Sequence, residues 1–436
     1  MTDNKKFTTS RRRFLQGLGA ASVVSQVPAF GRTLPLAEAA PTIIRAKGQK
    51  SIVCIFLRGA ADGLNMIVPY GDSSYEGHRP TMAMDLDDGL IKLDSTFALH
   101  PALAPLESLY KNKRFAPIIC AGSTHRTRSH FDAQDWMEFA APGNRTMREG
   151  WLNRYLISTK TESSATFRAM AIQELLPRSL RGAFPVLAVP GNATNKKSND
   201  NLDIFERFYG DSGGMLEGGE MANRDRENDS AGVVESGRMT IETLRRFQEI
   251  VGKAPKKRDS NETVSGSAYS SSRFSRGLQQ IAKVLKAGEG LEVAGIDYGG
   301  WDDHTGEGGV EGKMATRMSD FAQSLSAFCA DLGQDLDNTT IMVMTEFGRT
   351  VRENGNVGTD HGHGSTMFVI GGEVNGGKVH GDWTGLAKKD LYQGRDLAVT
   401  TDFRNVYHSV LKNHLGFKSP QEFFPDFRPS EIKSLY

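Results

Sequence analysis

The sequence predicts an α/β protein with a doubly wound, mostly parallel sheet and helices on both faces. Short apolar runs bounded by glycine or polar residues are typical of strands that are covered on both sides. Segments with apolar residues at helical spacing alternate with these runs, and this alternation favours a parallel sheet. The length of 436 residues allows one large domain or two.

The strands are predicted first from continuous apolar runs. Four runs indicate buried strands, at residues 51–57 (SIVCIFL), 115–120 (FAPIIC), 340–344 (TIMVM) and 366–370 (TMFVI). Three weaker runs, at residues 169–173, 185–189 and 291–296, predict further strands of the same sheet.

The helices are predicted from apolar residues that recur every three or four positions. The clearest helix covers about residues 313–336, where one apolar stripe is formed by Met314, Met318, Phe321, Leu325, Phe328, Leu332 and Leu336. Further helices are predicted at residues 101–110, 130–139, 276–286 and 402–415.

The middle of the chain differs in composition from the rest. Residues 192–275 are rich in asparagine, serine, glycine and charged residues, with two helical pieces near 202–209 and 239–251. We interpret this stretch as a polar insert or cap rather than a second full domain. Residues 40–436 are therefore predicted to form a single domain that carries the insert.

The N-terminus has the features of an export signal. Paired arginines precede Phe14-Leu15, a weakly apolar run follows at 17–30, and a small-x-small pattern lies at 37–39. This order predicts a twin-arginine signal peptide over residues 1–39. The apolar run is too short, and too rich in small residues, for a stable membrane span. We expect the twin-arginine machinery to export the protein to a bacterial periplasm or beyond.

Charge and cysteine content exclude two other classes of protein. The 53 basic and 52 acidic residues nearly cancel, whereas a nucleic-acid-binding protein shows a basic excess. Cys54, Cys120 and Cys329 lie in apolar patterns and are predicted to be buried, inert thiols. No C-x-x-C pair indicates a cysteine zinc site or redox chemistry.

Polar residues follow the predicted strands at the point where a site is expected. Sites in parallel α/β sheets form beyond the carboxyl ends of the strands, so five polar loops are predicted to converge on one edge. Aspartate, glutamate and histidine are the ligands of hydrolytic metal centres. The predicted ligands of one or two divalent ions (zinc, manganese, magnesium or calcium) are Asp62, Asp302, His304, Glu346, Asp360, His361 and His363.

An anion pocket is predicted beside these ligands. The helix that begins near Ser129 offers backbone N–H groups to an anion, and Arg126, Arg128 and Arg349 could neutralise the anion. The hydroxyl of Ser129 lies at the start of this helix.

Each residue also has a purely structural interpretation. Asp62 alone is typical of a turn or helix N-cap, as is Ser129. Glu346 and Arg349 could form a structural ion pair, and Asp302 with Asp303 could form a solvated turn. The metal-site hypothesis depends on the joint placement of these residues.

Eight motifs together resemble a known family. They are FLRGAADGLNMIVPY (56–70), LHPALAPL (99–106), SHFDAQDWME (129–138), GWLNRYL (150–156), GWDDHTGEG (300–308), TEFGRT (345–350), GTDHGHGSTMFVIGG (358–372) and TTDFRNVYHSVLKNHLGF (400–417). The chain is similar to a bacterial family of twin-arginine-exported, sulfatase-like proteins of unknown function in the alkaline phosphatase superfamily.

The resemblance implies an alkaline-phosphatase/sulfatase-like fold with a two-metal site. By position, Asp62 resembles the metal ligand after the first strand, and Asp302 with His304 resembles the first-metal pair. His361 and His363 resemble the late histidine that precedes a strand. Ser129, with Thr127 and Thr124 as alternatives, resembles the residue at a helix start that reacts with the phosphoryl group, and Ser129 is therefore the predicted nucleophile. Superfamily members usually carry Asp-His after the strand here written TIMVM, whereas this chain has Glu346-Phe347. The chain therefore lacks the usual Asp-His pair of the second metal site.

The sequence therefore predicts an exported metal-dependent hydrolase of phosphate or sulfate esters, with an anionic ester as substrate. A phosphoryl transferase or mutase would use the same site. The alternative is a non-catalytic binding or assembly protein of the same fold, stabilised by metal and bound to a protein partner.

Overall fold

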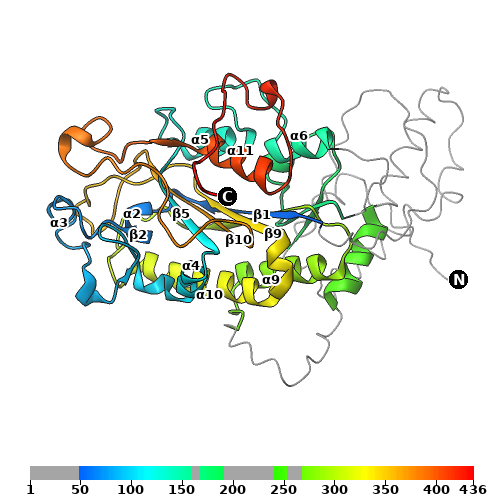
Figure 1. The fold of residues 1–436 in the computed structure, drawn as a ribbon, viewed down its shortest axis with the longest axis horizontal. Coiled ribbons are helices and arrows are strands. Elements are labelled where there is room, and N and C mark those ends of the chain that lie inside the picture. The colour runs from blue at the N-terminus through cyan, green and yellow to red at the C-terminus, as the bar shows by residue number, and fades with distance from the viewer. Residues whose placement is uncertain (1–48, 160–166, 191–239, 253–267) are drawn as a thin grey trace, which may run out of the picture.

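An eight-stranded sheet forms the centre of the structure, a computed structural model that describes residues 49–159, 167–190, 240–252 and 268–436 (Figure 1). The strand order is β11-β5-β10-β9-β1-β8-β6-β7. The strands are β1 (Ser51–Arg58), β5 (Phe115–Gly122), β6 (Ala169–Ile172), β7 (Leu187–Val189), β8 (Val293–Gly299), β9 (Thr339–Met344), β10 (Ser365–Gly371) and β11 (Thr401–Asp402). The seven predicted strands are all present, and the two-residue strand β11 is additional.

All pairings in this sheet are parallel except those of β10. This strand runs antiparallel to both of its neighbours, β5 and β9. Its first residues therefore lie at the edge where the parallel strands end. The loop before β10 and the loops after β1, β5, β8 and β9 consequently meet at one edge of the sheet.

Helices cover both faces of the sheet (Figure 1). One layer contains α5 (His130–Phe139), α6 (Trp151–Ser158) and α11 (Phe403–Asn413), and the other contains α4 (Glu107–Lys111), α9 (Arg273–Ala287) and α10 (Lys313–Leu332). Alternate residues of β1 enter the two cores: Val53 and Ile55 pack in one, Ile52 and Phe56 in the other. This period of two explains why the strand is apolar throughout. The predicted fold class, a mostly parallel sheet between helical layers, is confirmed.

Two predicted helices are partly 3₁₀ rather than α-helical. The segment at 101–110 divides into a 3₁₀ helix, η2 (Pro101–Leu106), and α4, because Pro105 lacks the N–H group that a continuous α-helix requires. Helix α10 ends at Leu332, where Gly333 adopts φ of 55°, and continues as the 3₁₀ helix η4 (Gly333–Asn338).

Short elements complete the described chain. They are α2 (Gly63–Met66), α3 (Tyr75–His78), the 3₁₀ helices η1 (Leu86–Asp88), η3 (Arg178–Leu180), η5 (Lys388–Asp390) and η6 (Gln421–Phe423), and a small sheet of β2 (Ile67–Val68), β4 (Ala98–Leu99) and β3 (Ile91–Lys92).

Several predictions fall partly or wholly outside the described residues. The signal peptide at 1–39 lies outside them, as does most of the 192–275 insert, including its helical piece near 202–209. Within that insert, residues 240–252 are helical. Their side chains Leu244, Phe247 and Ile250 pack into the same core as Val53 and Ile55. None of the helices in the described ranges has the length and apolar character needed to cross a bilayer. The three cysteines are buried and free, as predicted.

Candidate metal centre

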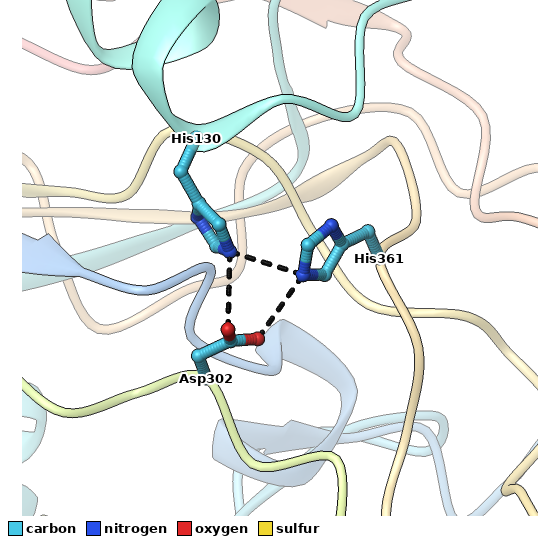
Figure 2. Close-up of side chains that lie close together, drawn as sticks. All are labelled: His130, Asp302 and His361. Atoms are coloured by element: carbon cyan, nitrogen blue, oxygen red, sulfur yellow. Dashed lines mark hydrogen bonds and ion pairs between the residues drawn. The ribbon is translucent and has the colours of Figure 1, made fainter.

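Three side chains from distant parts of the chain meet at the carboxyl edge of the sheet (Figure 2). His130 begins α5, Asp302 follows β8, and His361 precedes β10. The Nε2 atoms of His130 and His361 lie 3.0 Å apart. Asp302 places Oδ1 3.1 Å from His361 Nε2 and Oδ2 3.3 Å from His130 Nε2. These distances put the donor atoms in the range from which one ion could be bound.

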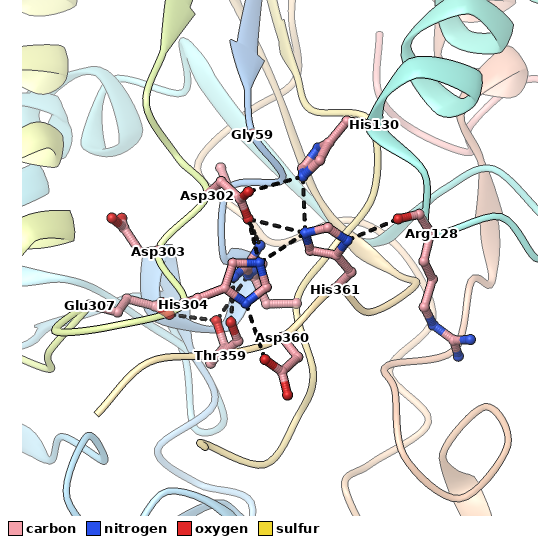
Figure 3. A network of polar contacts seen from close by, with 12 residues as sticks. Gly59, Arg128, His130, Asp302, Asp303, His304, Glu307, Thr359, Asp360 and His361 are labelled. Atoms are coloured by element: carbon pink, nitrogen blue, oxygen red, sulfur yellow. Dashed lines mark hydrogen bonds and ion pairs between the residues drawn. The ribbon is translucent and has the colours of Figure 1, made fainter. Parts of the chain in front are cut away.

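A fourth side chain, His304, extends this group (Figure 3). Its Nε2 lies 3.0 Å from His361 Nε2 and 2.9 Å from Asp302 Oδ1. We call His130, Asp302, His304 and His361 the metal cluster. The side chains of Asp302 and His304 are 42% and 44% exposed, so the cluster opens to solvent.

The other ring nitrogen of each cluster histidine has an oxygen acceptor. His130 Nδ1 lies 2.7 Å from Glu346 Oε1, and His304 Nδ1 lies 3.1 Å from Asp360 Oδ1. His361 Nδ1 lies 2.9 Å from the carbonyl oxygen of Arg128. Because these oxygens only accept, each Nδ1 donates its proton, and a neutral ring presents the lone pair of Nε2. Metal-binding histidines are held in this way.

The donor set fits a divalent ion. Three Nε2 lone pairs and a carboxylate that face one another repel unless a cation or proton lies between them. Donors about 2.0–2.1 Å from a tetrahedral zinc ion lie about 3.3 Å apart. The donor atoms of His130, Asp302 and His361 all lie within 4.8 Å of one another, with contacts of 3.0 to 3.3 Å, and His304 lies beside this group of three. Imidazole nitrogens with a carboxylate suit zinc and other first-row transition metals.

Glu346, two residues after the end of β9, orients the cluster through His130. Its Oε1 accepts hydrogen bonds from His130 Nδ1, from Gln134 Nε2 at 2.8 Å and from the Gly59 N–H at 2.9 Å. Burial alone would raise the pKa of Glu346, but the hydrogen bonds from His130 and Gln134 lower it. The same hydrogen bond raises the pKa of His130. A fully buried carboxylate with these partners positions His130 rather than facing the cluster.

Arg349 stabilises Asp302 as a carboxylate. Its Nη1 donates to Asp302 Oδ1 at 2.6 Å, and only 1% of the Arg349 side chain is exposed. Partial burial would raise the pKa of Asp302, but the hydrogen bond and charge of Arg349 lower it. The guanidinium also donates to the hydroxyl of Thr359 at 3.0 Å. Arg349 is thus held between the cluster and the interior.

The structure places two predicted ligands away from the cluster. Asp62 caps α2 by accepting from the Leu64 N–H, and its carboxylate pairs with Arg79 at 2.5 Å. His363 is buried and stacks on Tyr392, and burial lowers its pKa to about 4.

The other predicted ligands lie in or next to the cluster. Asp302, His304 and His361 belong to it, while Asp360 and Glu346 contact its histidines at Nδ1.

The predicted anion-binding and nucleophilic residues have different positions. Arg128 contributes its carbonyl to the cluster, whereas its guanidinium turns away and pairs with buried Asp396 at 2.5 Å (Figure 3). Ser129 is exposed at the N-cap position of α5, next to His130, and its side chain makes no capping hydrogen bond. Thr127 accepts from the Ser129 N–H at 3.2 Å, and Thr124 is exposed.

The sequence reasoning did not select His130 as a ligand. The spacing of His130, Gln134 and Glu138 contains the missed signal, since polar residues four positions apart share one face of a helix. This face contacts the strand ends, because Gln134 and His130 bond to Glu346 and Glu138 bonds to Arg58. Arg395 was also missed. It is 42% exposed and donates to the His361 carbonyl at 3.1 Å.

Comparisons with known proteins give the following matches. The profile of a family described as "Protein of unknown function (DUF1501)" matches residues 49–422. No curated protein matches the chain. One similar solved structure is the C-terminal periplasmic domain of EcEptC from Escherichia coli in complex with zinc. It shares 9% identity with a TM-score of 0.33, and the match covers 77% of this chain and 78% of that one.

Proposed function

This chain belongs to the DUF1501 family, whose function is unknown, and we propose that it is an exported metal-dependent hydrolase of phosphate or sulfate esters. One observation carries the proposal. Three histidines each donate a hydrogen bond from Nδ1–H to an oxygen acceptor and turn Nε2 toward one partly exposed carboxylate, that of Asp302. A site with this geometry suits a divalent ion and is open to a substrate.

The metal cluster would hold the ion. A divalent ion bound there supplies Lewis acidity and neutralises the charge of an anionic ester. The protein's own residues keep the donors in place: Glu346 fixes His130, Asp360 fixes His304, and Arg349 fixes the carboxylate of Asp302. Partners of this kind pre-organise a site, so that little reorganisation is needed when a ligand arrives.

Groups beside the cluster are suited to an anion. Arg395 keeps much of its guanidinium exposed while it contacts the loop of His361. Helix α5 begins at His130, and the free N–H groups of its first turn favour negative charge. Ser129 is our proposed nucleophile, because its exposed hydroxyl directly precedes His130 in the chain. Thr127 and Thr124 are the alternative hydroxyls.

The test begins with metal content and then measures turnover. We expect the purified protein to contain a divalent metal and to hydrolyse at least one member of a panel of phosphate and sulfate esters. His361→Ala should lose both properties. His408→Ala is the matched control, since His408 lies on α11 and contacts Ser419 instead of the cluster. A metal-free protein together with an unchanged His361→Ala variant would refute the proposal.

One observation favours a second candidate, a non-catalytic protein stabilised by metal. The guanidiniums of Arg128 and Arg349, both predicted to bind the substrate, are engaged with Asp396 and Asp302. Bound metal without turnover on any ester, together with a stable protein partner, would support this candidate. Turnover that is lost in Ser129→Ala would exclude it.

A further inference from the structure

A second set of charged side chains lies buried behind the metal cluster. Asp62, Arg79 and Glu307 are only 2%, 0% and 1% exposed. Arg79 donates from Nη1 to Asp62 Oδ2 at 2.5 Å, and its Nε and Nη2 donate to the backbone carbonyls of Val351 and Thr350. Every nitrogen of this guanidinium therefore has an acceptor, and the group is fixed in place.

Each oxygen of the two carboxylates in this set accepts a hydrogen bond. Asp62 Oδ1 accepts from the Leu64 N–H, and Oδ2 accepts from Arg79. Glu307 Oε1 accepts from Asn65 Nδ2 at 3.2 Å, and Oε2 accepts from the Thr359 hydroxyl at 2.5 Å. Burial and the neighbouring charge of Asp62 raise the pKa of Glu307.

A directed hydrogen-bond chain joins this set to the cluster. Arg349 Nε donates to the Thr359 hydroxyl, which donates its single proton onward to Glu307. Arg349 Nη1 donates to Asp302 in the cluster. Two buried guanidiniums are thus placed at the two aspartates, Asp62 and Asp302, that were predicted to bind metal on different loops.

The metal cluster is suited to bind an ion, whereas the surroundings of Asp62 are not. The cluster has three Nε2 atoms with free lone pairs and an exposed carboxylate. At Asp62 the carboxylate is inaccessible to solvent and already faces a permanent cation, since arginine does not lose its proton in proteins. A second ion at Asp62 would have to displace a buried guanidinium and leave it without a partner.

We infer that this chain binds a single ion, at the metal cluster, and that Arg79 supplies fixed positive charge at Asp62 in place of a second ion. The inference rests on the proposed function, because it takes the metal cluster to be a real ion site. It departs from the two-metal arrangement that the sequence resemblance implies. One consequence is that a chelator can remove only one equivalent of cation, whereas the charge at Asp62 stays.

The stoichiometry of retained metal tests this inference. The full chain would be stripped with a chelator, loaded with Zn²⁺ alone, desalted, and measured by elemental analysis against protein concentration. We expect one retained equivalent in the unmodified protein, one in Asp62→Asn, and none in His361→Ala. Calorimetric titration with Zn²⁺ gives an independent count.

The possible results separate the inference from the proposed function. Two retained equivalents in the unmodified protein would overturn the inference and leave the proposed metal enzyme intact. No retained metal would overturn both. Because Asp62 is buried against Arg79, its variant could fail to fold. The count in the unmodified protein decides the inference in that case.

Discussion

Glu346→Gln offers the sharpest perturbation of the metal centre, because it removes a charge while keeping the shape of the side chain. Three N–H groups converge on Oε1 of Glu346, from His130, Gln134 and Gly59. The amide oxygen of glutamine can still accept these bonds. Its amide nitrogen would face the Thr345 hydroxyl, which lies 3.1 Å from Oε2.

The expected loss follows from the role of this carboxylate. A negative charge 2.7 Å from His130 Nδ1 makes Nε2 a stronger donor to a cation. Removing such a partner typically weakens metal binding about 10- to 100-fold. This range corresponds to about 1.4–2.7 kcal/mol. We therefore expect the Kd for Zn²⁺ to rise within this range while the fold is preserved.

The assay is a competition between the protein and a zinc-binding dye, with urea unfolding of the metal-free protein as a check on folding. Glu373→Gln is the matched control, because Glu373 pairs with Lys50 at the far end of β10. If Glu346→Gln bound Zn²⁺ as tightly as the unmodified protein, the assignment of Glu346 as the residue that orients His130 would be wrong. An equal loss in the Glu373 control would also refute the reasoning.

Three further predictions concern the interior, the pH dependence and the substrate. Thr359→Val breaks the hydrogen-bond chain to Glu307 and should lower the free energy of unfolding by about 1–3 kcal/mol in urea denaturation, whereas Thr359→Ser should restore most of it. Buried His100 accepts a hydrogen bond from the Ala102 N–H at Nδ1 and contacts the Gly309 carbonyl through Nε2. The ring is therefore neutral in the folded state, and burial lowers the pKa of His100. The contribution of neutral His100 to the free energy of unfolding is complete above the pKa of about 6.5 that histidine has in the unfolded chain. This contribution is lost as pH falls toward the lower pKa of the folded state, and the free energy of unfolding then changes by up to about 1.4 kcal/mol per pH unit. Unfolding curves of His100→Gln between pH 7 and pH 5 should show a shallower pH dependence, and an unchanged slope would contradict the assignment. Arg395→Ala should raise KM for an anionic ester about tenfold, as expected for the loss of one charge-assisted hydrogen bond, while the amount of retained metal stays unchanged. A change in metal content instead would assign Arg395 to the metal cluster.

The sheet was predictable because its strands are buried on both faces, so their apolar runs are continuous and stand out from the loops. The direction of β10 was not predictable, since a run such as TMFVI is equally apolar in either direction. The antiparallel direction of β10 still leaves His361 at the predicted edge of the sheet. His361 precedes β10, and the reversed strand brings its first residues to the edge where β9 and β8 end.

The choice between ligands and structural residues was harder to predict. Asp62 and Asp302 both follow strands and look equivalent in the sequence. They differ in their cationic partners, because Arg79 reaches Asp62 from 17 positions away while Arg349 reaches Asp302 from 47 positions away. Only the first of these aspartates is sealed from solvent. Burial and partner identity come from tertiary packing, which local patterns do not encode.

Close packing of two loops explains why His361 and Arg349 both contact the carboxylate of Asp302. The Gly348 N–H donates to the His363 carbonyl, and the Gly362 N–H donates to the Gly348 carbonyl, each at 2.8 Å. A side chain at Gly362 would meet the backbone of Arg349, and one at Gly348 would meet the backbone of Gly364. Glycine at both positions therefore lets the segment TDHGHGS lie directly against TEFGRT. This contact places an imidazole from one loop and a guanidinium from the other on the same carboxylate oxygen, Oδ1 of Asp302. Gly348 and Gly362 thus help to set the geometry of the metal cluster without contributing a donor to it.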